Sequence, residues 1–254
     1  MAKKDEQIEG QLDIFDFCTK PDYEVVQSNK LISGKQTLSL NSAKLLRSAI
    51  MQIKPEDEEF KAYIVSIPEL AKMFGIDRSD LYRDIKGIAS ELMASPLYLS
   101  AGSEKNEKWI AYSWVSYCGF ESERGLIIKL NSDLKPLLIQ LKENYTQYYL
   151  ESILRMRSVF SIRIFELMQS KIYEKTIPKK GVDVTLSVEE IRQACDIVDK
   201  FKAYTSFKNK VILVALKEIH EKTFYDVTYL ELYKKRKIVA FTFHVTMNYM
   251  KNLH

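Results

Sequence analysis

Hydrophobic and polar positions follow one order twice along the chain. A short alternating segment comes first, at residues 61–65 and again at residues 182–186, and this period of two predicts a β-strand. Two stretches with apolar residues three or four positions apart follow in each copy, and they predict a pair of amphipathic helices. Alternating segments separated by polar turns come next and predict antiparallel hairpins. Both copies therefore predict a strand, two helices and a hairpin.

The first helix of each copy begins at a capping signal. Ser66 stands three residues before Glu69, and Ser187 stands three residues before Glu190. In a capping box of this spacing the serine side chain accepts a hydrogen bond from the backbone N–H of the glutamate, which starts a helix abruptly. Gly75 supplies the turn after the first of these helices, because glycine adopts a positive φ at little cost.

The second helices share an apolar face. Asp77 or Ser79 is expected to cap the first of them, Pro96 to end it, and the second is expected over residues 206–222. The matching apolar positions are Leu81, Ile85, Ile88 and Ala89 in one copy and Phe207, Val211, Val214 and Ala215 in the other. The sequence thus predicts an α+β fold of two tandem winged helix-turn-helix domains related by internal duplication.

The predicted domain boundary lies in a polar segment near residue 143. Residues 1–21 are expected to form a flexible N-terminal tail, residues 22–143 the first winged-helix domain and residues 144–254 the second. Helical spacing is expected from residue 148 to residue 174, and the loop 104–108 is expected at the tip of the first wing.

Positive charge is concentrated at one end of the chain. The net charge is +4, but residues 200–254 hold eleven lysines and arginines against four acidic residues, so this stretch carries +7 and the remainder −3. A cationic face is the expected footprint of phosphate binding, and a solvated charged surface is the alternative.

Candidate DNA contacts lie on the exposed faces of the second helices and on the second wing. Asparagine can pair with adenine through two hydrogen bonds, and lysine can donate to guanine. The candidates are Lys202, Ser206, Lys208, Asn209, Lys210 and Lys217 around the second helix, Lys234, Lys235, Arg236 and Lys237 on its wing, and Arg78, Arg83 and Lys86 in the first copy.

Enzymatic signals are missing from the sequence. It has no glycine-rich loop followed by lysine and serine or threonine, so a Walker-type nucleotidase is not expected. The histidines His220, His244 and His254 lack metal-ligand spacing. We therefore expect a protein that is not an enzyme, without metal or cofactor.

Cysteine content and hydropathy predict a cytoplasmic protein. The cysteines Cys18, Cys118 and Cys195 form no disulfide framework. No apolar run is long enough to span a bilayer, and residues 1–6 lack the apolar core of a signal peptide, so no membrane association is expected.

Several ordered motifs resemble a known family. The run YTQYYL at residues 145–150, with SVFSIRIFELM at residues 158–168, resembles the signature of the iteron-binding plasmid replication initiators of the RepB-like, Rep type 3 family. Residues 25–32 resemble that family's opening strand, and residues 204–211 its second recognition helix. The resemblance covers about residues 22–246.

The resemblance implies two winged-helix domains that bind repeated origin sequences, the iterons, as a monomer. It also implies a homodimer in equilibrium with the monomer, formed through the first domain, that binds an inverted-repeat operator and represses its own gene. Opening of AT-rich DNA and recruitment of host helicase and initiator proteins are implied as well. By position Lys208, Asn209 and Lys210 would lie in the major groove, and Arg163 would support the domain or contact the DNA backbone. Ser206 stands where aspartate is common in the family, and Asn209 where a second basic residue is common.

A peptide in the predicted tail resembles a second motif. Gln11, Leu12, Ile14 and Phe15 belong to the segment QLDIF, which is similar to the pentapeptide by which bacterial proteins bind the host sliding clamp. A tail peptide of this kind would place its apolar side chains in a groove of the clamp, and packing on the first domain is the alternative.

Two other functions fit parts of the sequence, and a third lacks the residues it needs. A dimeric winged-helix repressor without an initiator role would share the DNA-binding residues. A winged-helix protein-interaction module would carry the basic face without using it. A nicking enzyme would need a metal-binding histidine pair beside a nucleophilic tyrosine, and that pair is missing.

Overall fold

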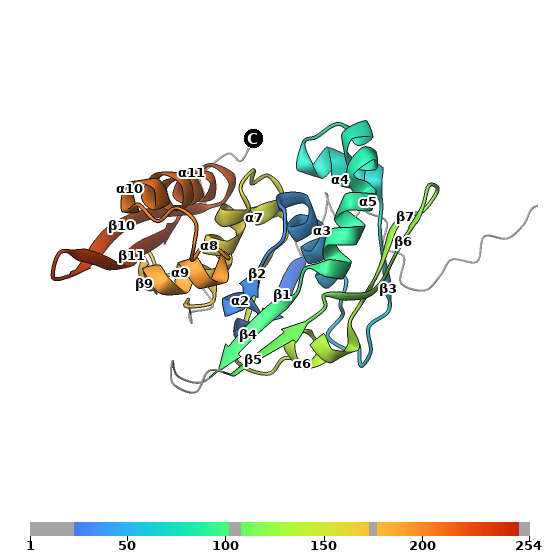
Figure 1. Cartoon of the computed structure of the whole chain (residues 1–254), viewed down its shortest axis with the longest axis horizontal. Coiled ribbons are helices and arrows are strands. Elements are labelled where there is room, and N and C mark those ends of the chain that lie inside the picture. The colour runs from blue at the N-terminus through green and yellow to red at the C-terminus, as the bar shows by residue number, and fades with distance from the viewer. Residues whose placement is uncertain (1–22, 102–107, 173–176, 249–254) are drawn as a thin grey trace, which may run out of the picture.

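Two α+β units lie side by side in the computed structural model, which describes residues 23–101, 108–172 and 177–248 (Figure 1). The first unit is coloured blue to green, and the second orange to red. In this view the hairpin of each unit projects away from the middle of the molecule.

Each unit contains the predicted order of strand, helix, helix and hairpin. The first consists of β3 (Ala62–Val65), α4 (Ile67–Phe74), α5 (Arg78–Ala94), β6 (Val115–Glu121) and β7 (Gly125–Leu130). The second consists of β9 (Val182–Ser187), α9 (Val188–Ala194), α10 (Tyr204–Phe207), the π-helical segment η2 (Lys208–Ile212), α11 (Leu213–Lys222), β10 (Tyr225–Lys234) and β11 (Lys237–Met247). In both sheets the strand before the helices pairs antiparallel with the last strand of the hairpin, giving the orders β3-β7-β6 and β9-β11-β10. The tandem winged-helix fold is confirmed.

Only one of the two predicted capping boxes has its serine hydrogen bond. Ser187 Oγ accepts from the backbone N–H of Glu190 at 3.0 Å. Ser66 occupies the equivalent N-cap position, but its side chain makes no capping hydrogen bond to the described residues of α4. Pro68 lies in the first turn, where its missing N–H removes one possible donor and its fixed φ favours the helix. The prediction for Ser66 was therefore wrong, although the helix begins where it was expected.

The turn between α4 and α5 forms as predicted. Gly75 has φ +65°, in the left-handed region that favours glycine. The Asp77 side chain accepts from the backbone N–H of Ser79 at 2.7 Å and caps α5.

The first wing differs from the prediction. The predicted loop 104–108 falls between β4 (Leu97–Ala101) and β5 (Lys108–Tyr112), with Lys108 as the first residue of β5. These strands form a separate sheet with β2 (Lys35–Gln36). Residues 104–107 of that loop lie outside the described ranges. The hairpin joined to β3 is β6–β7, whose turn lies at residues 122–124.

A strand replaces the start of the predicted 148–174 helical stretch. β8 (Tyr145–Tyr149) pairs antiparallel with β1 (Glu24–Ser28), so residues expected to open the second domain are hydrogen-bonded to the opening strand of the first. Helices α7 (Glu151–Leu154) and α8 (Val159–Gln169) follow. The remaining elements are α2 (Asn29–Ser33), α3 (Leu40–Ile50), the 3₁₀ turn η1 (Ser132–Leu134) and α6 (Lys135–Leu138).

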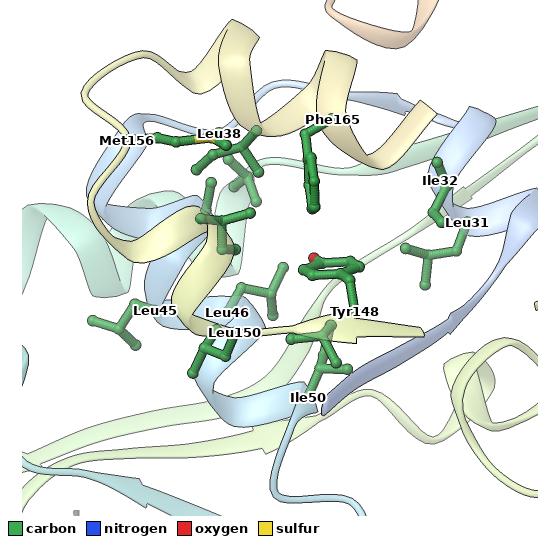
Figure 2. Close-up of a cluster of buried hydrophobic side chains, with 14 of the residues drawn as sticks. Leu31, Ile32, Leu38, Leu45, Leu46, Ile50, Tyr148, Leu150, Met156 and Phe165 are labelled. Atoms are coloured by element: carbon green, nitrogen blue, oxygen red, sulfur yellow. The ribbon is translucent and has the colours of Figure 1, made fainter. Parts of the chain in front are cut away.

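The core beside β8 is built from residues far apart in the sequence. Leu46 of α3, Tyr148 of β8 and Phe165 of α8 are all buried and meet in one cluster (Figure 2). The Tyr148 and Phe165 rings pack edge to face with centroids 5.4 Å apart. Helix α8 and the paired strands β1 and β8 therefore share one hydrophobic core.

A buried charge cluster lies in the same region. Glu166, fully buried in α8, accepts hydrogen bonds from Arg47 at 2.9 Å, Arg163 at 2.7 Å, Tyr148 at 2.6 Å and Gln27 at 2.8 Å. Burial alone would raise the pKa of Glu166, but the Arg47 and Arg163 guanidinium groups outweigh it and lower this pKa from 4.5 to about 2. A single carboxylate therefore connects α3, α8, β1 and β8.

Polar contacts also join the two units. Asp196, just after α9, accepts from Thr37 at 2.8 Å and pairs with Lys35 Nζ at 2.8 Å. Glu218 of α11 accepts from the backbone N–H groups of Arg157 and Ser158, at 3.0 and 3.1 Å. These contacts hold the second unit against the segment around β2 and against the start of α8.

Candidate nucleic-acid interface

The long helix of the second unit, α10 to α11, turns one face to the sheet and another to solvent. Phe207, Val211 and Ala215 are fully buried, and the Phe207 ring lies 6.3 Å from that of Phe241 in β11. Asn209 and Lys210 are exposed on the outer face. A helix anchored by an apolar face with polar side chains outward is what insertion into a major groove requires.

Three further candidates lie along the same helix or just before it. Lys202 and Lys217 are exposed, whereas Ser206 is half-buried. Lys202 lies 4.0 Å from Asp199, and Lys217 lies 3.9 Å from Glu221. Exposed pairs at these distances are weak, so both lysines can exchange their partner for a phosphate.

Lys208 does not extend into solvent as predicted. Its Nζ lies 2.6 Å from Glu231 Oε1 on β10, and it also lies 5.5 Å from the centre of the Tyr229 ring. The hydrogen bond to Glu231 raises the pKa of Lys208 above its usual value. Lys208 is therefore turned toward the hairpin of its own unit.

Glu231 is a part of this surface that the sequence reasoning missed. Oε1 accepts from Lys208 and from the Tyr204 hydroxyl, and Oε2 accepts from the Tyr233 hydroxyl at 2.7 Å. The hydrogen bonds from Lys208, Tyr204 and Tyr233 lower the pKa of Glu231 to about 2. The alternation of Tyr229, Glu231 and Tyr233 along β10 was visible in the sequence, but the helix residues that meet them were not.

The wing of the second unit carries the cationic tip. Strands β10 and β11 pair from Tyr225 with Met247 to Lys234 with Lys237. Lys235 has φ +57° in the connecting turn. All four predicted tip residues are exposed, namely Lys234, Lys235, Arg236 and Lys237. Four clustered cations at the end of a hairpin suit contacts with phosphates.

The corresponding surface of the first unit is closer to neutral. Arg83 is 71% exposed but pairs with Asp80 at 2.9 Å and lies 3.6 Å from Asp84. Arg78 lies over the Tyr82 ring, 5.1 Å from its centre. Exposed Lys86 lines a hollow of about 330 Å³ between α5 and β6. Acidic neighbours on α5 thus reduce the positive field that these cations would give.

Comparison with known proteins agrees with this geometry. Residues 24–169 match the family described as initiator replication protein, WH1, and residues 187–245 match initiator Rep protein, WH2. The chain belongs to the initiator replication proteins. The first match ends at the last residue of α8, so it includes β8 and the carboxylate cluster with the first winged domain.

One sequence relative and one solved structure resemble this initiator replication protein. A replication initiation protein of Escherichia coli is 25% identical over 166 residues, which make up 64% of this chain and 51% of that protein, so the chain spans about half the length of this relative. The crystal structure of Pi initiator protein in complex with iteron DNA matches with a TM-score of 0.72 and 18% identity, covering 91% of this chain and 99% of that one. This second likeness supports the fold.

Arg163 lies in the core of this initiator, away from the exposed cations of the candidate interface. Its side chain is 2% exposed, pairs with Glu166 and donates to the backbone carbonyls of Ile32 and Gly34. Of its two predicted roles, supporting the domain agrees with this position, whereas contact with the DNA backbone would require α8 to leave the core.

Other predicted sites fall outside what the structure describes. The residues of the predicted clamp-binding peptide, Gln11, Leu12, Ile14 and Phe15, lie within residues 1–22, and their role stays a prediction.

Within the described ranges no helix is long and apolar enough to cross a membrane. No group of three His, Cys, Asp or Glu side chains that could hold a metal ion occurs there either.

Proposed function

We propose that this initiator replication protein binds directly repeated sequences at a plasmid origin and promotes opening of the adjacent DNA. The observation that carries the proposal is the second unit, where exposed Asn209 and Lys210 lie on a recognition helix beside a four-cation wing. Base contacts would come from the helix, and the wing would bind phosphates. The first unit, with its paired arginines, would add weaker contacts.

A binding experiment with matched variants tests this proposal. We expect footprints on direct repeats beside the gene, and Asn209→Ala or Lys210→Ala should weaken binding there by about 5- to 150-fold, because each would lose a base contact. Lys142→Ala, an exposed lysine before β8, serves as the control and should leave binding unchanged. Protection of a single inverted repeat alone would favour a repressor instead, and no protection of either DNA would refute DNA recognition.

The proposal includes a homodimer formed through the first unit. The hairpin β4–β5 exposes Trp109 (61%) and Ile110 (56%), two large apolar side chains whose burial would favour association. In the dimer the protein would bind an inverted-repeat operator and repress its own gene. Sedimentation should show self-association that Ile110→Glu abolishes while single-repeat binding is retained.

Recruitment of host proteins completes the proposed role. A sliding clamp would bind the segment around Gln11 and Phe15, and helicase and host initiator proteins would join at the opened origin. Pull-down of the clamp with the full chain and with a Leu12→Ala, Phe15→Ala variant tests the first of these contacts. Equal recovery with both proteins would exclude the peptide.

A further inference from the structure

The acidic side chain of Glu231 lies between the second helix and the cationic wing of the second unit. It is 16% exposed and receives hydrogen bonds from both sides, since Lys208 and Tyr204 belong to the helix and Tyr233 to the hairpin near its tip. A carboxylate beside a DNA-binding surface repels phosphates. A carboxylate at this position should therefore have a function that outweighs its repulsion of phosphates.

The carboxylate joins the two parts of the proposed DNA-binding surface. Glu231 stands three residues before the first cation of the wing tip, and Lys208 stands immediately before Asn209. The 2.6 Å contact between Glu231 and Lys208 therefore connects the wing, near its tip, to the residue next to the proposed base-reading positions. Any movement of the wing relative to the helix has to break or stretch this contact.

The helix has an unusual conformation at the same place. Residues Lys208–Ile212 form a π-helical segment. Such segments are rare in proteins overall, and those that occur often lie at functional sites. In this segment Lys208 turns to the hairpin while Asn209 and Lys210 remain exposed. In this segment the side chain of Lys208 therefore points in a different direction from those of Asn209 and Lys210.

We infer that Glu231 is a positioning residue for DNA recognition, which withholds Lys208 from DNA phosphates and holds the wing against the recognition helix. This inference rests on the proposed DNA-binding function of the second unit. A lysine free to bind any phosphate adds affinity for all sequences alike, because phosphate contacts carry no sequence information. Withholding Lys208 leaves Asn209 and Lys210 as the nearest helix contacts and so raises the ratio of specific to non-specific binding.

Salt titration of binding tests the inference. Two DNA duplexes of equal length are used, one with the direct repeats beside the gene and one with the same bases scrambled. In Glu231→Gln the released Lys208 should steepen the slope of log affinity against log salt on the scrambled duplex by about 0.9. Affinity for that duplex should rise about fivefold at 0.15 M salt, and the ratio between the two duplexes should fall.

The companion variants separate positioning from a structural role. Lys208→Met alone should leave the salt slope unchanged. Combined with Glu231→Gln, it should cancel the steeper slope that Glu231→Gln produces alone. Glu221→Gln removes an acidic charge next to the already exposed Lys217, so it is the control for net charge and should not steepen the slope. A purely structural Glu231 would lower the melting temperature and leave all slopes unchanged.

Each outcome decides the question. A slope that falls by about 0.9 in Lys208→Met would show that Lys208 contacts DNA, which overturns the inference. An unchanged slope in Glu231→Gln overturns it too. If the unaltered protein binds neither duplex, the proposed function and this inference fail together. If it binds both equally, the proposed recognition of repeats fails, while the slopes still decide whether Glu231 withholds Lys208.

Discussion

Glu166→Gln removes the charge that compensates two buried guanidinium groups. The glutamine keeps the size of the side chain and one acceptor oxygen, but its amide group would face donors from Arg47 and Arg163. Both arginines are at most 2% exposed, so water cannot replace the lost carboxylate. The substitution therefore removes the negative charge and one acceptor without opening a cavity.

The size of the effect follows from the geometry and from the pKa. A pKa of Glu166 lowered from 4.5 to about 2 corresponds to roughly 3 kcal/mol of preference for the charged form in the folded protein. Removing one partner of a buried ion pair costs about 3–5 kcal/mol. We expect a loss of unfolding free energy of about 3–4 kcal/mol at pH 7, which would lower the urea midpoint by about 1–2 M.

Urea unfolding followed by tryptophan fluorescence measures this loss. Trp114 is fully buried in the first unit and reports its unfolding, and Trp109→Phe removes the signal of the exposed tryptophan. Glu121→Gln is the control, because its pair with Arg124 at 3.2 Å is exposed and should contribute less than about 0.5 kcal/mol. A loss below about 1 kcal/mol in Glu166→Gln would refute the reasoning.

The pH dependence gives a second test of the same cluster. The pKa of Glu166 is lower in the folded than in the unfolded protein, so its stabilisation is present above pH 4.5 and disappears as the pH falls toward 2. The difference in unfolding free energy between the original protein and Glu166→Gln should therefore shrink over this range. A difference that is constant between pH 7 and pH 3 would contradict the assigned charge state.

Three further predictions concern other parts of the chain. Burial lowers the pKa of Lys44 to about 8, although the charge of Glu218 opposes this shift. The unfolding free energy, relative to that of Lys44→Met, should therefore rise by up to about 3 kcal/mol from pH 8 to 10.5. Unfolding curves followed by circular dichroism that show no change over this pH range would contradict the prediction. Gly125→Ala should cost at least about 2 kcal/mol in urea unfolding, because φ is +111° and the new Cβ would lie 2.4 Å from the Val65 carbonyl oxygen. Gly75→Ala, with open space around it, should cost about 1 kcal/mol, and equal losses would refute the close contact. Arg236→Ala should lower the salt slope of DNA binding by about 0.9, and an unchanged slope would exclude the wing tip from the interface.

Local sequence patterns were sufficient for the repeated unit. The capping pair Ser187 and Glu190, the turn at Gly75 and the apolar face around Phe207 all depend on residues within a few positions of one another. Such signals act through neighbouring backbone groups and can be read without knowing the rest of the fold.

Contacts distant in the sequence were not predictable in the same way. Tyr145–Tyr149 shows the alternation of a strand, with Thr146 and Tyr148 buried, but its partner strand β1 lies at the other end of the domain. The prediction therefore extended the helical spacing of the following residues back to residue 148. The position of the first wing was missed for a similar reason, because strand pairing decides which hairpin joins the sheet.

The charged residues show a further limit. Lys208 and Arg163 were counted as available cations, yet each is paired with a glutamate, Glu231 and Glu166. Arg163 and Glu166 are three residues apart in a largely apolar helix, which was a usable sign of a buried pair. The pair of Lys208 and Glu231 arises from packing of the helix on the hairpin and has no local sign.

The pairing of β1 with β8 has a consequence for synthesis of the protein. Tyr148 follows Gln27 by 121 residues, and Glu166 follows Arg47 by 119. At translation rates of about 5–20 residues per second, the first strand waits roughly 6–24 s for its partner to leave the ribosome. During that interval the nascent chain holds Arg47 without its carboxylate. If a ribosome stalled before codon 166 and its chain were then released, that chain could not complete its first domain. Such a chain would be a ready substrate for chaperones and proteases.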